Sequence, residues 1–327
     1  MSTAQDKTIA SFEEQLLTSV IPPDHAYRKL NRLINFDEIA GSLEKTYSHL
    51  GQKGIPAIRG LKALLLQFWE DYSDREMEAA VRENLAIRWF CGFSLTEKTP
   101  DHSYFGKFRR RIGTQHFADI FNSINERLRK EGLFGNIFHF IDASTIVTKS
   151  ALWEERDRAI KDGHDKLNNL IVKDYAADKE ARWGAKSKKN IWFGYKRHTA
   201  VDMRYGLISK TTVTPANVLD YQVIEQICPK EGYVFMDKLY DTKDTDRKIR
   251  ASGCSPGTIR KNNNPNKNKD LDRWRTSMRM PYEGTFSKLP KRARYRGKTK
   301  VAFQNFGESI AYNLKKAIHY LPESTYL

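Results

Sequence analysis

Three acidic residues stand where packing alone gives no reason for a charge. Asp142 and Asp237 each end an apolar, β-prone run, and Glu283 precedes a stretch rich in Lys and Arg. Burying a carboxylate costs free energy unless it meets a cation. Asp and Glu oxygens are hard ligands that suit Mg²⁺, and two such ions about 4 Å apart can promote phosphodiester displacement. The three acids therefore predict a metal-dependent enzyme that acts on nucleic acid.

Each acid, taken singly, also has a structural interpretation. Asp142 suits a turn after a strand, and Asp237 suits the start of the turn Lys238–Tyr240, because Asp is common in turns. Asp241 competes with Asp237 for the same role. Glu283 alone is typical of a solvated helix residue. Taken together, with the strand order below, the clustered acids favour a metal site.

The charge balance points to a polyanionic partner. The chain has 327 residues, a formal net charge of +16 and a sequence pI of about 9.6. Such an excess of positive charge is typical of proteins that bind nucleic acid. The apolar run Ala63–Leu66 is far shorter than the ~20 residues of a membrane-spanning helix, and the polar segment Met1–Ala10 lacks a signal-peptide core. Cys91, Cys228 and Cys254 form no CxxC pair, so we expect a reducing cytoplasm, no disulfide and no zinc site.

The first 135 residues have the pattern of helices. Ser73 and Glu76 have the spacing of a capping box, which starts a helix expected to reach Trp89. Arg109–Arg111 lie on the next expected helix, Ser103–Ile112. A helix-turn-helix is one interpretation of this pair, and a solvated basic face is the other. One apolar helical stripe before them consists of Leu61, Leu64, Leu65 and Phe68.

From residue 136 the pattern changes to strands separated by helices, which predicts a mixed sheet covered by helices. Lys149–Lys189 is expected to be an exposed charged segment, and Lys261–Lys269 a mobile loop. The expected strands are Ile137–Val147, Trp192–Val201, Leu207–Val213, Tyr233–Met236 and Thr258–Ile259. The expected helices are Asn217–Cys228, Lys243–Ser252, Leu271–Leu289 with a break near Pro281, and Phe303–Ile318.

Longer motifs run through nearly the whole chain. They are Pro100–Ser103, Ala181–Gly184, Phe193–His198, Thr214–Asp220, Phe235–Asp241, Arg279 with Tyr282–Glu283, and Arg294–Gly297. Together they resemble the motifs of bacterial DDE insertion-sequence transposases, in the group around insertion-sequence families four and five. Two positions depart from that pattern. Thr276 stands where the family often has Tyr, and Pro290 stands where it has Lys, with Lys288 and Lys291 on either side.

The resemblance implies an α/β fold: an RNase H-like catalytic domain at 136–327, with a mixed five-stranded sheet and flanking helices. An all-helical domain at 1–135 would precede it, bind DNA ends and dimerise. Asp142, Asp237 and Glu283 would be the catalytic residues and would hold two Mg²⁺ or Mn²⁺ ions. The implied activity is cut-and-paste transposition. A homodimer would cut double-stranded DNA at terminal inverted repeats and join the ends to target DNA, in the bacterial cytoplasm and associated with the nucleoid.

Basic residues in four places, together with Trp183, are the predicted DNA contacts. From Lys288 to Lys300, seven of 13 residues are Lys or Arg and none is acidic, which favours a phosphate-contacting track. Trp183 could stack on bases of an opened DNA end, whereas Trp192 fits a core position. His139 and His198 are expected to be packed structural residues. The full predicted DNA-binding set is Arg109, Arg110, Arg111, Trp183, Lys186, Lys188, Lys189, Arg279, Lys288, Lys291, Arg292, Arg294 and Arg296.

Two other functions stay open at this point. A repurposed or decayed transposase would bind DNA without cutting it; the intact acids argue against this, and the missing motif lysine argues for it. A simple metal-dependent nuclease would cut DNA but would be unable to join ends.

Overall fold

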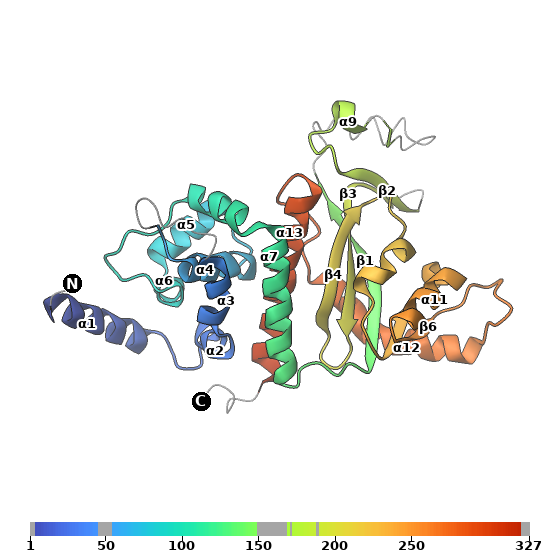
Figure 1. Ribbon diagram of the computed structural model, residues 1–327, viewed down its shortest axis with the longest axis horizontal. Coiled ribbons are helices and arrows are strands. Elements are labelled where there is room, and N and C mark those ends of the chain that lie inside the picture. The colour runs from blue at the N-terminus through green and yellow to red at the C-terminus, as the bar shows by residue number, and fades with distance from the viewer. Residues whose placement is uncertain (1–3, 45–53, 149–168, 171, 188–189, 322–327) are drawn as a thin grey trace. The chain divides into compact units, whose positions relative to one another are not determined.

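A computed structural model describes residues 4–44, 54–148, 169–170, 172–187 and 190–321 of the protein. The chain divides into two compact units (Figure 1). One consists of residues 1–127 and 310–327, and the other of residues 128–309. The functional division of the chain at residue 135 remains a prediction.

The helical unit is built around α4 (Ala57–Trp69). Leu61 and Leu64 are fully buried in it, so the predicted apolar stripe is confirmed. The other helices of the unit's N-terminal part are α1 (Ala4–Val20), α2 (Ala26–Leu33), α3 (Phe36–Glu44), α5 (Asp74–Glu83), α6 (Leu85–Cys91) and most of α7 (His102–Lys130).

Helix α5 begins at the predicted capping box. Ser73 Oγ accepts from the Glu76 N–H at 3.3 Å, and Glu76 Oε2 accepts from the Ser73 N–H at 2.7 Å. The expectation of one helix from Ser73 to Trp89 is wrong, because Asn84 has extended backbone angles. Its side-chain oxygen accepts from the Ile87 N–H at 3.1 Å and so caps a separate helix, α6.

Helix α7 changes direction at Gly113, whose φ of 69° and ψ of 163° lie outside the helical region. The predicted packing face of its first half is confirmed, since Phe105, Phe108 and Ile112 are at most 1% exposed. Gly132, just beyond the helix, has a φ of +73°, as expected for a C-terminal cap.

The second unit contains a six-stranded sheet. Its strand order is β2 (Arg182–Ser187), β3 (Asn190–Asp202), β1 (Phe138–Val147), β5 (Tyr233–Met236) and β6 (Ser255–Thr258), with β4 (Leu207–Pro215) also paired to β3. Strands β1, β3 and β4 are antiparallel neighbours, whereas β5 and β6 run parallel to β1. This is an RNase H-like arrangement, as predicted. The expected count of five strands is wrong, because the short β2 pairs with the start of β3.

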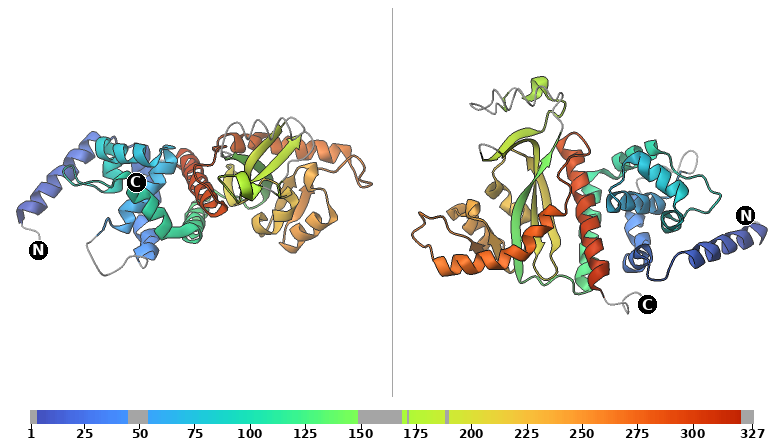
Figure 2. Two further views of the ribbon diagram at one scale, coloured as in Figure 1. Left: turned by 90° about the horizontal axis from the view of Figure 1, so that it is seen from above. Right: turned by 180° about the vertical axis from the view of Figure 1, so that it is seen from behind.

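Helices cover both faces of this sheet. Neighbouring residues of a strand point to opposite faces, so each face has apolar side chains that a helix can cover. Ile141 packs with η1 (Asp220–Val223), α10 (Ile224–Ile227) and α11 (Lys243–Ala251). Phe140, one residue earlier, packs on the other face against Phe286 of α12 (Lys269–Ser287). Figure 2 shows α12 crossing the sheet as seen from behind. Two short elements complete this part of the chain, α9 (Val172–Tyr175) and η2 (Lys238–Tyr240).

Two local expectations are corrected. Helix α12 is not broken near Pro281; it continues through it, because the hydrogen bond that Pro removes lies on the exposed side of the helix. The segment expected to be a mobile loop is ordered by its own polar contacts. Lys267 Nζ donates to Arg260 O at 3.1 Å, and Asn268 Oδ1 caps α12.

The closing helix α13 (Lys298–Tyr320) begins in the sheet unit and enters the helical unit at Ile310. Within the sheet unit, Glu308 forms a fully buried ion pair with Arg197 of β3. Asn305 Oδ1 also accepts from Arg197 Nε, at 2.6 Å. This polar network holds the first part of α13 against the sheet.

Candidate active site

Asp142 and Asp237 occupy adjoining positions on two parallel strands. Phe140 of β1 is the register partner of Phe235 of β5, and each aspartate comes two residues later. Asp142 lies inside β1, which continues to Val147 as the expected strand Ile137–Val147 does, so the alternative of a turn at Asp142 is wrong. Asp237 does follow the last residue of β5. The sheet therefore gives these two aspartates neighbouring backbone positions where β5 stops.

The partly buried carboxylate of Asp142 is poorly compensated. Its Oδ1 accepts from the backbone N–H of Ala143 at 2.8 Å, and no side-chain cation of the described residues hydrogen-bonds to it. Burial raises its pKa from an ordinary 3.8 to about 6. The charges of Arg279 and Lys186 work against this rise in pKa, and the charge of Asp220 adds to it. A cation bound here would remove the cost of burying the charge.

Asp237 and its sequence competitor Asp241 have different surroundings. Asp237 starts the η2 turn, where its Oδ1 accepts from the Lys238 N–H. Asp241 is bound on several sides by Arg260 Nη1 at 2.8 Å, the Lys261 N–H at 2.7 Å and Asn264 Nδ2 at 3.0 Å. The oxygens of Asp241 are thus already hydrogen-bonded within a cluster of their own. Asp237, which directly follows the strand next to that of Asp142, remains the candidate metal ligand.

Glu283 stands on α12, which covers the sheet face that holds Phe140. Its side chain is 56% exposed, and its Oε1 lies 3.4 Å from Arg279 Nη2. The Arg279 guanidinium lies 5.0 Å from the centre of the Phe140 ring, and its positive charge lowers the pKa of Asp142. Arg279 therefore interacts with carboxylates on both the helix and the sheet.

Oxygen donors of the kind that bind Mg²⁺ are present at all three predicted positions. The described residues nevertheless contain no group of three or more His, Cys, Asp or Glu arranged to hold a metal ion. Asp142 and Asp237 fit such a site by position. Glu283 is paired with Arg279 and would have to exchange that partner for a metal.

A fourth carboxylate, Asp220, was missed as a site residue. It begins η1, and its Oδ1 lies 2.9 Å from Lys196 Nζ, which also donates to Val218 O at 2.9 Å. The negative charge of Asp220 adds to the rise in the pKa of Asp142. The only sequence signal was its place at the end of the motif Thr214–Asp220, which gave it no individual role.

The predicted basic track passes the end of the strand that carries Asp142. The Val147 N–H of β1 donates to Lys291 O at 2.7 Å, and the Ala293 N–H donates to Val147 O at 2.8 Å. Within the track, Arg294 differs from its neighbours because it influences a buried acid. Burial raises the pKa of Glu308, and the positive charges of Arg197 and Arg294 lower it. The exposed members of the predicted set in this segment are Lys288, Lys291, Arg292 and Arg296.

Lys186 of β2 is exposed, and its charge works against the rise in the pKa of Asp142. Lys188 and Lys189 lie outside the described residues. In the helical unit, Arg110 and Arg111 are exposed. Arg109 instead makes a bidentate ion pair with Asp74, with Nη1–Oδ1 at 2.7 Å and Nη2–Oδ2 at 2.6 Å. Its contacts are therefore structural.

The proposed stacking of Trp183 on DNA is wrong for this structure. Its ring is 3% exposed and packs 5.2 Å from the ring of Phe193 in the core. Trp192 is buried, as expected. His139 and His198 are buried too, and burial lowers both pKa values, that of His198 to about 4. Both histidines therefore fit the structural role expected for them.

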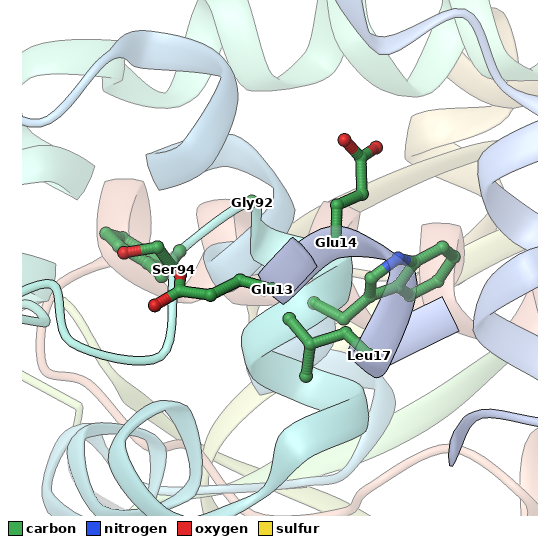
Figure 3. Close-up of a pocket in the computed structure, with 7 residues that line it drawn as sticks. Glu13, Glu14, Leu17, Gly92 and Ser94 are labelled. Atoms are coloured by element: carbon green, nitrogen blue, oxygen red, sulfur yellow. The ribbon is translucent and has the colours of Figure 1, made fainter. Parts of the chain in front are cut away.

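The helical unit also contains a cavity of about 220 Å³ (Figure 3). Glu13 points toward Ser94 there, and its Oε2 accepts from the Leu95 N–H at 3.2 Å. Two carboxylates repel phosphate, so this cavity does not suit a nucleic-acid backbone. Its lining consists of Glu13, Glu14, Leu17, Trp89, Gly92, Phe93 and Ser94.

Comparison with known proteins identifies the family. Residues 136–314 match the Transposase DDE domain, and residues 15–111 match the Transposase domain (DUF772). A piggyBac transposase synaptic complex with hairpin DNA, solved by cryo-EM, is similar over 89% of this chain and 75% of that one. The identity is 7% and the TM-score 0.37, which is too low to establish a relationship by itself.

Helices long and apolar enough to cross a membrane are absent from the described part of the chain. The first match covers the strands that carry Asp142 and Asp237 and the helix that carries Glu283. The chain belongs to the Transposase DDE domain family and is a DNA transposase, an enzyme of the metal-dependent polynucleotidyl transferase class.

Proposed function

We propose that this chain is a cut-and-paste transposase of a bacterial insertion sequence, acting on the chromosome in the cytoplasm. The observation that supports this most directly is the placement of Asp142 and Asp237 at adjoining positions of parallel strands. In the described part of the chain, neither carboxylate is hydrogen-bonded by a side-chain cation. Acids left uncompensated in this way are costly to the fold and are characteristic of functional sites.

Asp142, Asp237 and Glu283 are the residues that would hold two divalent ions, Mg²⁺ or Mn²⁺. Ions bound there would supply electrostatic stabilisation of the attacking and leaving oxygens during phosphodiester exchange. Glu283 would join the two aspartates by leaving Arg279. The released guanidinium would then be placed to hold a DNA phosphate through two hydrogen bonds.

The proposed reaction has two chemically similar steps. Water first displaces a bridging oxygen at the element end, which breaks one P–O bond and leaves a 3′-hydroxyl. That hydroxyl then displaces a bridging oxygen of the target strand, forming one P–O bond as another breaks. Because each step exchanges one oxygen for another at phosphorus, no covalent protein–DNA intermediate is required.

Basic residues around the acids would position the two DNA segments. The charge of Lys186 acts against the rise in the pKa of Asp142, and Lys291 and Arg292 pair with Val147 at the end of β1. Contacts of this kind neutralise phosphates without reading sequence. Since two element ends must be processed together, we expect a dimer on DNA that supplies two active sites.

The first half of α7 is the proposed reader of the element ends. Its apolar face is buried, Arg109 is paired with Asp74, and Arg110 and Arg111 are exposed. One bidentate Arg–guanine contact contributes ~1–3 kcal/mol of discrimination. Competition binding against random duplex should therefore show a reduced preference in Arg110→Ala or Arg111→Ala. Unchanged preference in both variants would place recognition elsewhere.

The proposed function is tested with Asp142→Asn and Asp237→Asn, which keep the shape of the side chains. Cleavage of an element-end duplex, and joining of a pre-nicked end, should fall by more than the ~10–100-fold expected for loss of an outer-shell partner. DNA binding should remain. Normal cleavage by either variant would exclude that residue as a ligand, and cleavage without joining in the parent would indicate a nuclease.

The second candidate is a DNA-binding protein derived from a transposase that no longer cuts. The Glu283–Arg279 pair and Pro290 at the motif lysine position favour it. The same assay separates the two functions. A parent protein that binds element ends but neither cuts nor joins them, with Mg²⁺ or with Mn²⁺, would establish the second candidate.

A further inference from the structure

The hydroxyl of Tyr240 has no structural explanation in its immediate surroundings. Tyr240 closes the η2 turn, where its N–H donates to Asp237 O at 3.0 Å. Its ring packs in the core with Ile141 and Met236, and the side chain is fully buried. The Oη atom is buried without a hydrogen-bond partner within the described chain. Packing therefore accounts for the ring but not for the hydroxyl.

An unpaired buried hydroxyl destabilises a fold, and a phenylalanine would fill the same space without this cost. The surroundings of this hydroxyl are unusual as well. Burial and the carboxylates of Asp142, Asp220 and Asp237 raise the pKa of Tyr240 well above its ordinary value. The phenol is therefore a neutral hydrogen-bond donor in a core region where three carboxylates influence it.

One of the three carboxylates is the best acceptor for it. Asp220 is held by Lys196 at 2.9 Å, and Asp237 accepts from the Lys238 N–H at the start of the turn. Asp142 accepts from a backbone N–H through Oδ1 only, and it is the carboxylate that affects Tyr240 most strongly. Among the three, Asp142 therefore has the most acceptor capacity left for this hydroxyl.

We propose that Tyr240 is a positioning residue of the metal site, whose hydroxyl donates to the Asp142 carboxylate when that carboxylate binds a divalent cation. The inference rests on the proposed function, in which Asp142 is a metal ligand. A carboxylate that binds a metal through one oxygen can accept a hydrogen bond at the other. Such outer-shell hydrogen bonds fix the orientation of ligands, and their loss typically reduces metal affinity or activity ~10–100-fold.

The test compares Tyr240→Phe with a matched control, Tyr195→Phe. Tyr195 is also fully buried in this unit, but its hydroxyl donates to Asp178 at 2.8 Å. Mn²⁺ binding to the full chain on a short DNA duplex is measured by calorimetry, and Tm is measured without metal. Tyr240→Phe should weaken Mn²⁺ binding at least ~10-fold at an equal or higher Tm. Tyr195→Phe should lower Tm and leave Mn²⁺ affinity unchanged.

Asp142→Asn separates the two ways in which the idea can fail. If Asp142→Asn loses Mn²⁺ binding but Tyr240→Phe keeps the parental affinity, the role of Tyr240 is refuted and the ligand assignment stands. If Asp142→Asn also binds Mn²⁺ normally, or if the parent binds none, the ligand assignment itself fails. A lower Tm in Tyr240→Phe would show that the hydroxyl has a structural partner, and this would also overturn the inference.

Discussion

Asp237 and Asp241 stand four residues apart in the sequence but belong to two acidic clusters that differ in how their charge is compensated. Asp241 is 4% exposed in its side chain and is surrounded by Arg260, the Lys261 N–H and Asn264. Asp142 and Asp237, on the adjoining strand positions, have only backbone N–H donors among the described residues. The first cluster has the composition of a structural ion pair, and the second has oxygen donors of the kind that the proposed metal site would use. Compensation, more than burial, distinguishes the two.

The arginines show the same contrast. Arg109 and Arg260 each bind carboxylates at close to 2.7 Å and are integral to their units. Arg279 lies over the Phe140 ring and has one long ion-pair contact, at 3.4 Å, to an exposed glutamate, while its buried Nε has no hydrogen-bond partner among the described residues. An arginine held this loosely beside uncompensated acids is suited to change partners when DNA binds.

The largest expected effect is on chemistry and comes from Glu283→Gln. If Glu283 is the third ligand, cleavage of an element-end duplex should fall by more than ~100-fold, beyond what an outer-shell change costs. Stability should change little, because Glu283 is more than half exposed and its 3.4 Å contact with Arg279 is long, and ion pairs open to solvent contribute ~0–1 kcal/mol. Loss of one negative charge near phosphate should also tighten DNA binding slightly.

Asp270→Asn is the matched control for Glu283→Gln. Asp270 is on the same helix, is also exposed and also pairs with an arginine, Arg273 at 3.2 Å. Its loss should leave cleavage unchanged. Parental cleavage in Glu283→Gln would mean that the loose pair with Arg279 has no catalytic purpose, and the contrast with Asp241 would then concern Asp142 and Asp237 alone.

The second effect is on stability and comes from Asp241→Asn. Removing one partner of a buried ion pair leaves the other charge uncompensated, at a cost of about 3 kcal/mol in the free energy of unfolding. Urea unfolding should show this loss, whereas Asp142→Asn should be as stable as the parent or more so. Cleavage per folded molecule should largely survive in Asp241→Asn. Equal stability of Asp241→Asn and the parent would contradict the structural role assigned to this cluster.

The two clusters also predict opposite responses to pH in metal-free buffer. Burial raises the folded-state pKa of Asp142 to about 6, so its favourable contribution is complete below an unfolded pKa near 3.8 and disappears as pH rises through about 6. Burial alone would also raise the pKa of Asp241, but its hydrogen bonds with Lys261, Arg260 and Asn264 hold that pKa below 3.8. Its contribution is therefore present above that pH and is lost on acidification.

Urea unfolding of the parent, Asp142→Asn and Asp241→Asn between pH 4 and pH 7 measures these slopes. Relative to Asp142→Asn, the parent should lose stability as pH rises across this range. The difference between the parent and Asp241→Asn should instead stay constant there and shrink only at lower pH. A flat difference between the parent and Asp142→Asn would show that the carboxylate of Asp142 is not strained by burial.

Sequence reasoning located the sheet and the acids because both leave local signals. Alternating and apolar runs predicted β1, β3, β4 and β5 to within a few residues, since side-chain burial repeats every two residues. The short β2 was missed because its six residues include only two buried apolar or small ones and their partners are supplied by β3. The roles of Trp183 and Arg109 could not be predicted, because their burial and pairing depend on residues distant in the sequence.

The smallest effect concerns the basic track, residues 288–300. It tests whether interactions within the protein distinguish structural arginines from DNA-binding ones there. Arg292 and Arg296 are exposed, whereas the charge of Arg294 acts on the buried Glu308. A phosphate contact steepens the dependence of log affinity on log salt by up to ~0.9 for each neutralised phosphate. Arg292→Ala with Arg296→Ala should therefore flatten the slope by up to about 1.8 for two lost contacts. Arg294→Ala alone should leave the slope nearly unchanged and lower stability instead, because Glu308 loses part of its compensation.

Binding is measured on random duplex across a salt series, since phosphate contacts are independent of sequence. If Arg294→Ala flattens the slope as much as either neighbour does, its side chain reaches DNA despite its position near Glu308. Pairing within the protein would then no longer distinguish structural from DNA-binding arginines in this segment.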